Sequence, residues 1–172
     1  MPMRVRDFMP LVRDQTLARL PEELRDASHR IRSVWLQLHY HSAKVHYEVW
    51  LARKIERIEI GLHFEGPKEF SYLWAEHIAP YMPEIQARLG PQAELEEWTS
   101  SWARLHQTLP YDPLNEPLAD EIAARLADTI ITLQPIIERE RENVPVELEN
   151  AAVPKSGRPG RGFRGRRGRG RR

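Results

Sequence analysis

The sequence predicts an α+β protein with helices packed on an antiparallel five-stranded sheet, in the order α-βββ-α-ββ-α, followed by a disordered basic tail. Residues 31–65 and 94–109 alternate apolar and polar side chains, which is the period of a half-buried strand. The segments around them repeat apolar residues every three or four positions, as amphipathic helices do. Residues 157–172 contain no acidic and no aliphatic side chain, so they cannot bury enough apolar surface to fold alone.

The first elements are helices followed by three strands. Leu11, Leu17, Leu20 and Leu24 have helical spacing, and Pro21 predicts that this segment forms two short helices. The alternating stretch that follows predicts strands near 31–41, 45–52 and 55–65, with short turns at Ser42–Lys44 and Arg53–Lys54.

The second half of the chain adds a helical region, a hairpin and a long helix. Pro67 begins the helical region and Gly90 ends it, and a hairpin turns around Thr99–Ser101. Asn115 is a candidate cap for the final helix. The apolar stripe of that helix consists of Leu118, Ile122, Leu126, Ile130, Leu133 and Ile137.

Alternation divides the strand residues between two faces of the sheet. The apolar face is the predicted core, and the short turns would place Tyr40, Tyr47 and Ile60 in one cross-strand row. The apolar face consists of Val34, Leu36, Leu38, Tyr40, Val45, Tyr47, Val49, Leu51, Ile58, Ile60, Leu62, Phe64, Ala103, Leu105 and Leu109.

The opposite face carries four of the five tryptophans, which are Trp35, Trp50, Trp98 and Trp102, together with Arg104. Four indoles in water would form an unusually large apolar patch, so we expect something to cover this face. One interpretation is that the N-terminal helices, a second copy of the chain or another protein covers it. The other is that its aromatic rings stack on a ligand or on nucleic acid.

The same face carries the candidate catalytic residues His39, Glu48 and Glu59, which tight turns would align in one row. We interpret the row as a cross-strand ladder of ion pairs, with no metal and no cofactor. The alternative is a metal-dependent enzyme, for example one that hydrolyses phosphodiesters. The sequence contains no glycine-rich phosphate loop, nucleophile elbow or HExxH helix, so we favour a protein that is not an enzyme.

Charge is divided unevenly along the chain. Of 26 basic and 25 acidic residues, nine basic and no acidic ones lie between Lys155 and Arg172. Residues 1–154 therefore carry a net charge of −8 and the remainder +9. We predict a globular domain over 1–142, a linker over 143–156 and a tail over 157–172.

The tail resembles the arginine–glycine-rich boxes of nucleic-acid-binding proteins in its units GRG, FRG and RRGRG. Guanidinium groups contact phosphates and stack on bases. The tail is therefore a candidate RNA- or DNA-binding segment, with a solubility or self-association role as the alternative. The arginines concerned are Arg158, Arg161, Arg164, Arg166, Arg167, Arg169, Arg171 and Arg172.

A second resemblance covers residues 31–140. The stretches HYEVW, RIEIGLHFEG, PEIQARLG, LEEW and SWARLH resemble an uncharacterised bacterial α+β domain that accompanies restriction-endonuclease-like proteins. The resemblance implies an accessory module in a bacterial nucleic-acid context and no particular catalytic residue. The sequence also lacks cysteine and any run of 18 apolar residues, so we expect a cytoplasmic protein that does not enter the membrane.

Overall fold

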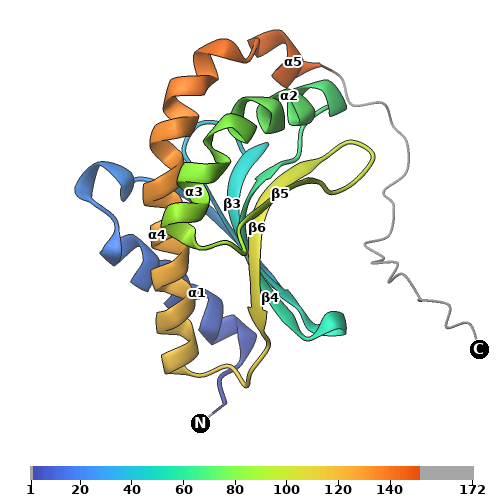
Figure 1. The fold of residues 1–172 in the computed structure, drawn as a ribbon. Coiled ribbons are helices and arrows are strands. Elements are labelled where there is room, and N and C mark those ends of the chain that lie inside the picture. The colour runs from blue at the N-terminus through green and yellow to red at the C-terminus, as the bar shows by residue number, and fades with distance from the viewer. Residues whose placement is uncertain (1, 152–172) are drawn as a thin grey trace, which may run out of the picture.

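The computed structural model describes residues 2–151 and is an α+β fold with a six-stranded antiparallel sheet (Figure 1). The strands lie side by side in the order β1-β2-β3-β4-β6-β5. Their bounds are Ser28–Arg32 for β1, Trp35–His39 for β2, Val45–Ala52 for β3, Arg57–Phe64 for β4, Glu94–Glu97 for β5 and Ala103–Pro110 for β6. The predicted tail, 157–172, lies outside the described residues.

The prediction of five strands is wrong because the first predicted strand, 31–41, contains a turn. Arg32 pairs with Trp35, so Ser33 and Val34 form a two-residue connection between β1 and β2. Neither residue is the Gly, Asn or Asp that usually marks such a tight hairpin. The sequence therefore carries no signal for this turn.

The helices gather on one side of the sheet (Figure 1). Their bounds are Val5–Arg19 for α1, Lys68–Ile78 for α2, Met82–Leu89 for α3, Glu116–Glu140 for α4 and Val146–Asn150 for α5. Helix α1 packs against α4 and β2, while α2 packs against β4, β5 and β6. None of the helices between residues 2 and 151 combines the length and apolar character needed to cross a membrane.

The long helix α4 is built as its sequence predicts. The Asn115 side chain accepts a hydrogen bond of 2.9 Å from the backbone N–H of Leu118, which satisfies one of the unpaired donors of the first turn. All members of the predicted apolar stripe are buried. The helix continues through Pro135 to Glu140. Beside this proline, the Gln134 side chain accepts a 2.9 Å hydrogen bond from the Tyr47 hydroxyl.

The predicted core face of the sheet is confirmed, since its residues are buried or pack against the buried cluster. The predicted row of Tyr40, Tyr47 and Ile60 is wrong. Tyr47 pairs with Leu38 and Leu62. The pairing registers of the β2–β3 and β3–β4 hairpins differ from the prediction by two residues, because the connections between the strands are longer than predicted. A slip of two residues leaves every side chain on its original face.

The two ends of the described chain also differ from the prediction. Pro21 follows the end of α1, but the second predicted helix is only a 3-10 turn at Glu22–Leu24. At the other end, residues assigned to the linker contain α5. Val144 is buried and Leu148 packs on the core. The folded body therefore extends beyond the predicted boundary at residue 142.

Candidate functional site

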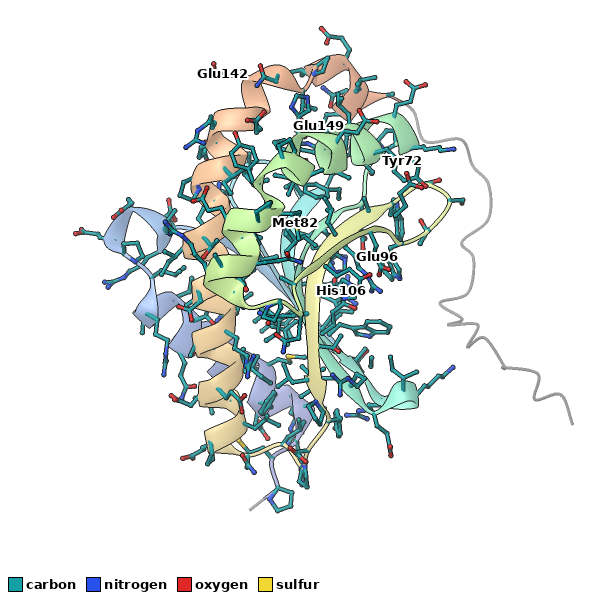
Figure 2. All side chains as sticks on the ribbon, in the orientation of Figure 1. Tyr72, Met82, Glu96, His106, Glu142 and Glu149 are labelled. Atoms are coloured by element: carbon teal, nitrogen blue, oxygen red, sulfur yellow. The ribbon has the colours of Figure 1, made fainter. Side chains whose placement is uncertain are left out.

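The face of the sheet opposite the helices, called here the open face, carries a group of charged and polar side chains. Figure 2 shows Glu96 and His106 on the side of the strands away from Met82 of α3. The strand register brings residues from five strands together. We call them the polar cluster, which consists of Gln37, His46, Glu48, Glu59, His63, Glu65, Glu96, Arg104 and His106.

Most of this cluster is buried although none of the described helices lies over it. The exposed fraction is 1% for Glu48, 0% for His63 and 3% for Arg104. Trp98 covers this part of the face. Its ring stands edge-on to His63 at 5.3 Å between centroids, and the Arg104 guanidinium lies 4.6 Å from its centroid. The indole therefore shields a charged group and an imidazole from water.

The β5–β6 turn holds Trp98 in this position. The backbone N–H of Trp98 donates to the Trp102 carbonyl at 2.9 Å, and the two indoles pack with centroids 6.0 Å apart. The Tyr72 hydroxyl of α2 donates to the Thr99 carbonyl at 2.7 Å. The core-packed helix α2 is thus tied to the turn that covers the open face.

Arg104 connects two carboxylates. Its Nη1 donates to Glu59 Oε2 at 2.6 Å, and its Nε and Nη2 donate to Glu96 Oε1 at 2.8 and 2.6 Å. Burial alone would raise the pKa of Glu59, but the hydrogen bond and charge of His63 and the charge of Arg104 lower it below its usual value. The Nε, Nη1 and Nη2 atoms of Arg104 thus each donate to a glutamate of the protein itself.

His63 lies between two glutamates. Its Nε2 is 2.7 Å from Glu59 Oε1, and its Nδ1 is 3.1 Å from Glu65 Oε1. Burial would lower the pKa of His63, but the charge of Glu48 and the hydrogen bonds to Glu59 and Glu65 raise it to about 10.

His46 and Glu48 complete the centre of the cluster. His46 Nδ1 is 2.8 Å from the Ala43 carbonyl, and its Nε2 is 3.0 Å from the Gln37 side-chain nitrogen. Gln37 also donates to Glu48 Oε2 at 2.7 Å. Burial raises the pKa of Glu48, but the charge of His63 and the contacts of His46 and Gln37 lower it to about 2. The other oxygen, Oε1, is buried and has no hydrogen-bond partner among the described residues.

The predicted row of His39, Glu48 and Glu59 does not form. Glu48 lies opposite Gln37 and Gly61, and Glu59 lies opposite Trp50 and Thr108. Both glutamates belong to the cluster, but His63 lies between them. His39 is half-buried, and its pKa is lowered by burial and by the neighbouring His46.

His46, His63 and Glu65 lie outside the predicted row but follow a recognisable pattern in the sequence. His46 and Glu48 form one His-x-Glu segment on β3, and His63 and Glu65 form another at the end of β4, with Glu65 directly after the strand. His46 pairs directly with His63. Two His-x-Glu segments on adjacent antiparallel strands place all four side chains on one face, because alternate residues share a face.

The four tryptophans of the open face form two pairs. Trp35 lies opposite Trp50 at the β2–β3 side, whereas Trp98 packs on Trp102 beyond the end of β5. All four are partly buried. The N-terminal helix α1 does not cover them, because it packs on the helix-covered face. The expectation of one large apolar patch is therefore replaced by two smaller aromatic groups beside a buried polar cluster.

Gly61 lies in the middle of this face between Glu48 and His106. A Cβ at this position would lie 2.5 Å from the Leu105 carbonyl oxygen and 2.8 Å from the His106 Cβ. We expect Gly61→Ala to separate β4 from β6 and to lower the free energy of unfolding by about 1–3 kcal/mol. Urea denaturation measures this change. An unaltered midpoint would contradict the close approach of the two strands.

The chain was compared with protein-family models, with curated proteins and with solved structures, and none of them matches it. The resemblance of residues 31–140 to a bacterial accessory domain stays a prediction.

Proposed function

We propose that this protein binds nucleic acid non-specifically through its C-terminal arginine–glycine segment, and that the acidic folded body acts as an accessory module without catalytic activity. The separation of charge carries the proposal. Residues 155–172 hold nine positive charges, and residues 1–154 have a net charge of −8. A strongly positive segment gains affinity for a polyanion by releasing its condensed counterions, whereas the acidic body is repelled.

The chemistry of the open face supports the same division of roles. Arg104 is a buried cation of that face, and Glu59 and Glu96 neutralise it. A buried arginine that already binds two carboxylates offers little to a phosphate group. The alternative of an enzyme based on His39, Glu48 and Glu59 is not favoured, because these side chains do not form the predicted row.

Removal of residues 155–172 tests the proposal. We expect the truncated protein to keep its melting temperature but to bind single-stranded RNA and DNA at least about tenfold more weakly at low salt. Fluorescence anisotropy with labelled oligonucleotides of several sequences measures this loss. Affinity of the full chain should fall linearly on a log–log plot against salt, with little dependence on base sequence.

Two variants of the full chain sharpen the test. A scrambled segment of the same composition should bind as the natural one does, because charge and not order supplies the affinity. Replacement of the eight arginines by lysine should weaken binding only in part, since ammonium groups keep the charge but do not stack on bases. If the truncated protein binds as tightly as the full chain, the proposal is wrong and the open face becomes the candidate surface.

A further inference from the structure

The two His-x-Glu segments of β3 and β4 bring four metal-ligand side chains to one point on the open face. His46, Glu48, His63 and Glu65 each offer one ligand atom, and these atoms all lie within 4.8 Å of one another. His46 and His63 are opposite each other in the sheet, with ring centroids 5.5 Å apart. Tetrahedral zinc has bonds of about 2.0–2.1 Å, so its ligand atoms are roughly 3.3 Å apart. Small side-chain rotations would close the observed group to that size.

His46 is oriented as a ligand. A metal-binding histidine usually donates the N–H of one ring nitrogen to a carbonyl or carboxylate, which leaves the other nitrogen with its lone pair toward the ion. His46 Nδ1 lies 2.8 Å from the Ala43 carbonyl oxygen, which can only accept. Nδ1 therefore carries the proton, and the Nε2 lone pair accepts a hydrogen bond of 3.0 Å from the Gln37 side-chain nitrogen, which an ion would replace.

His63 has the equivalent support from a carboxylate. Its Nε2 lies 2.7 Å from Glu59 Oε1, and Glu59 is held in turn by Arg104 through its other oxygen. This arrangement matches the carboxylate–histidine pairs that lie behind metal ions. It leaves Nδ1 facing Glu65, whose Oε1 is 3.1 Å away.

Glu48 supplies an observation that is independent of this clustering. The side chain is 1% exposed, and its Oε1 has no hydrogen-bond partner within residues 2–151. A buried carboxylate oxygen without a partner is costly, and such groups are normally paired or bound to a metal. The unpaired oxygen belongs to a residue whose neighbours are already arranged as ligands.

The charges of the four candidate ligands also favour the binding of a cation. Arg104 is taken up by Glu59 and Glu96, and in the described part of the chain the ion pairs of Glu48 and Glu65 are with histidines only. Metal ligands must be deprotonated, so binding releases any second proton from the imidazoles and leaves the two carboxylates with a charge of −2. A single divalent ion balances it.

We propose that His46 Nε2, His63 Nδ1 and the carboxylates of Glu48 and Glu65 bind one divalent transition-metal ion of the zinc class. Two imidazole nitrogens favour Zn²⁺, Co²⁺ or Mn²⁺ over Mg²⁺ and Ca²⁺, which prefer oxygen ligands only. Four protein ligands complete a tetrahedral shell and leave no position for a substrate, so the ion is structural and not catalytic. The bound ion would crosslink β3 to the end of β4. The proposal does not depend on the proposed function of the C-terminal segment.

Metal binding by the full chain tests the site. After treatment with a chelator and dialysis, the protein should retain about one equivalent of Zn²⁺ through gel filtration, measured by elemental mass spectrometry. Free Zn²⁺ at about 100 times its Kd should raise the melting temperature by about 5–10 °C. Mg²⁺ and Ca²⁺ should produce no such rise, and Co²⁺ should give visible absorption bands.

Substitutions assign the ligands. Glu48→Gln and His46→Gln should each weaken Zn²⁺ binding at least tenfold. Glu65→Gln at the rim of the site, where the side chain is 14% exposed, serves if the buried variants fail to fold. Glu94→Gln is the control for the alternative placement, because this exposed glutamate forms with Glu96 and His106 a second group that could hold a metal ion, and the variant should leave Zn²⁺ binding unchanged.

The proposal is overturned if the full chain retains no Zn²⁺ and shows no thermal shift. It is also overturned if the ligand variants bind Zn²⁺ as tightly as the Glu94→Gln control does, since the ion would then sit elsewhere.

Discussion

Ile60→Asp is expected to unfold the domain. Ile60 is fully buried on the helix-covered face and pairs with Val49 on β3 and Gln107 on β6. The substitution removes a core side chain, which by itself costs about 2–5 kcal/mol, and also places a carboxylate where no cation is paired with it. The sum is comparable with the total stability of a domain, which is about 5–15 kcal/mol. Circular dichroism and thermal melting measure the loss of structure.

The matched control is Ile131→Asp on α4. Ile131 is 37% exposed, and isoleucine and aspartate have similar helix propensities. We expect this variant to change the free energy of unfolding by about 0.5 kcal/mol or less, as surface substitutions usually do. If both variants melt at the temperature of the natural protein, the assignment of the core face is wrong.

Replacement of Arg104 by methionine should have the next largest effect. Arg104 and Glu59 form an ion pair of 2.6 Å in which each side chain is 4% exposed. Removing one partner of a buried ion pair costs about 3–5 kcal/mol, and Glu59 would lose the guanidinium while keeping its contact with His63. Chemical denaturation of Arg104→Met should show a loss of this size.

A second substitution separates charge from packing. Glu59→Gln added to Arg104→Met removes the uncompensated carboxylate, so the double variant should recover part of the lost stability. Arg125→Met is the control, because Arg125 and Glu121 form an exposed pair on α4 worth only about 0.3–0.5 kcal/mol. Equal effects of Arg104→Met and Arg125→Met would show that the polar cluster is not shielded from water.

The open face and the C-terminal segment have different chemistry. The charges of the polar cluster are paired inside the protein, and Glu48 and Glu65, which pair with histidines only, are the carboxylates that we assign to a metal ion. The segment beyond residue 154 contains cations with no acid beside them in the sequence. The melting temperature of the body is therefore expected to depend on chelators and divalent ions, and the affinity for nucleic acid is expected to depend on salt concentration.

The faces of the strands and most of the elements of this protein can be predicted from local patterns in its sequence. Leu36, Val49 and Leu105 were assigned to the core because strand residues alternate between two environments, and this alternation is visible in the letters alone. The apolar stripe of α4 and its Asn115 cap can also be predicted from the sequence, since both depend on residues a few positions apart. The membership of Glu48 and Glu59 in a group on the open face followed from the same local period.

Which of those residues lie side by side depends on contacts between distant parts of the chain. A hairpin whose connection is two residues longer keeps each side chain on its face but moves every cross-strand partner, so Glu48 lies beside Gly61 instead of Glu59. The pairing of His46 with His63 depends on that register. The cover over the cluster comes from Trp98, which a turn tied to Tyr72 carries across the open face. Such contacts join residues far apart in the chain, and no local period of the sequence records them.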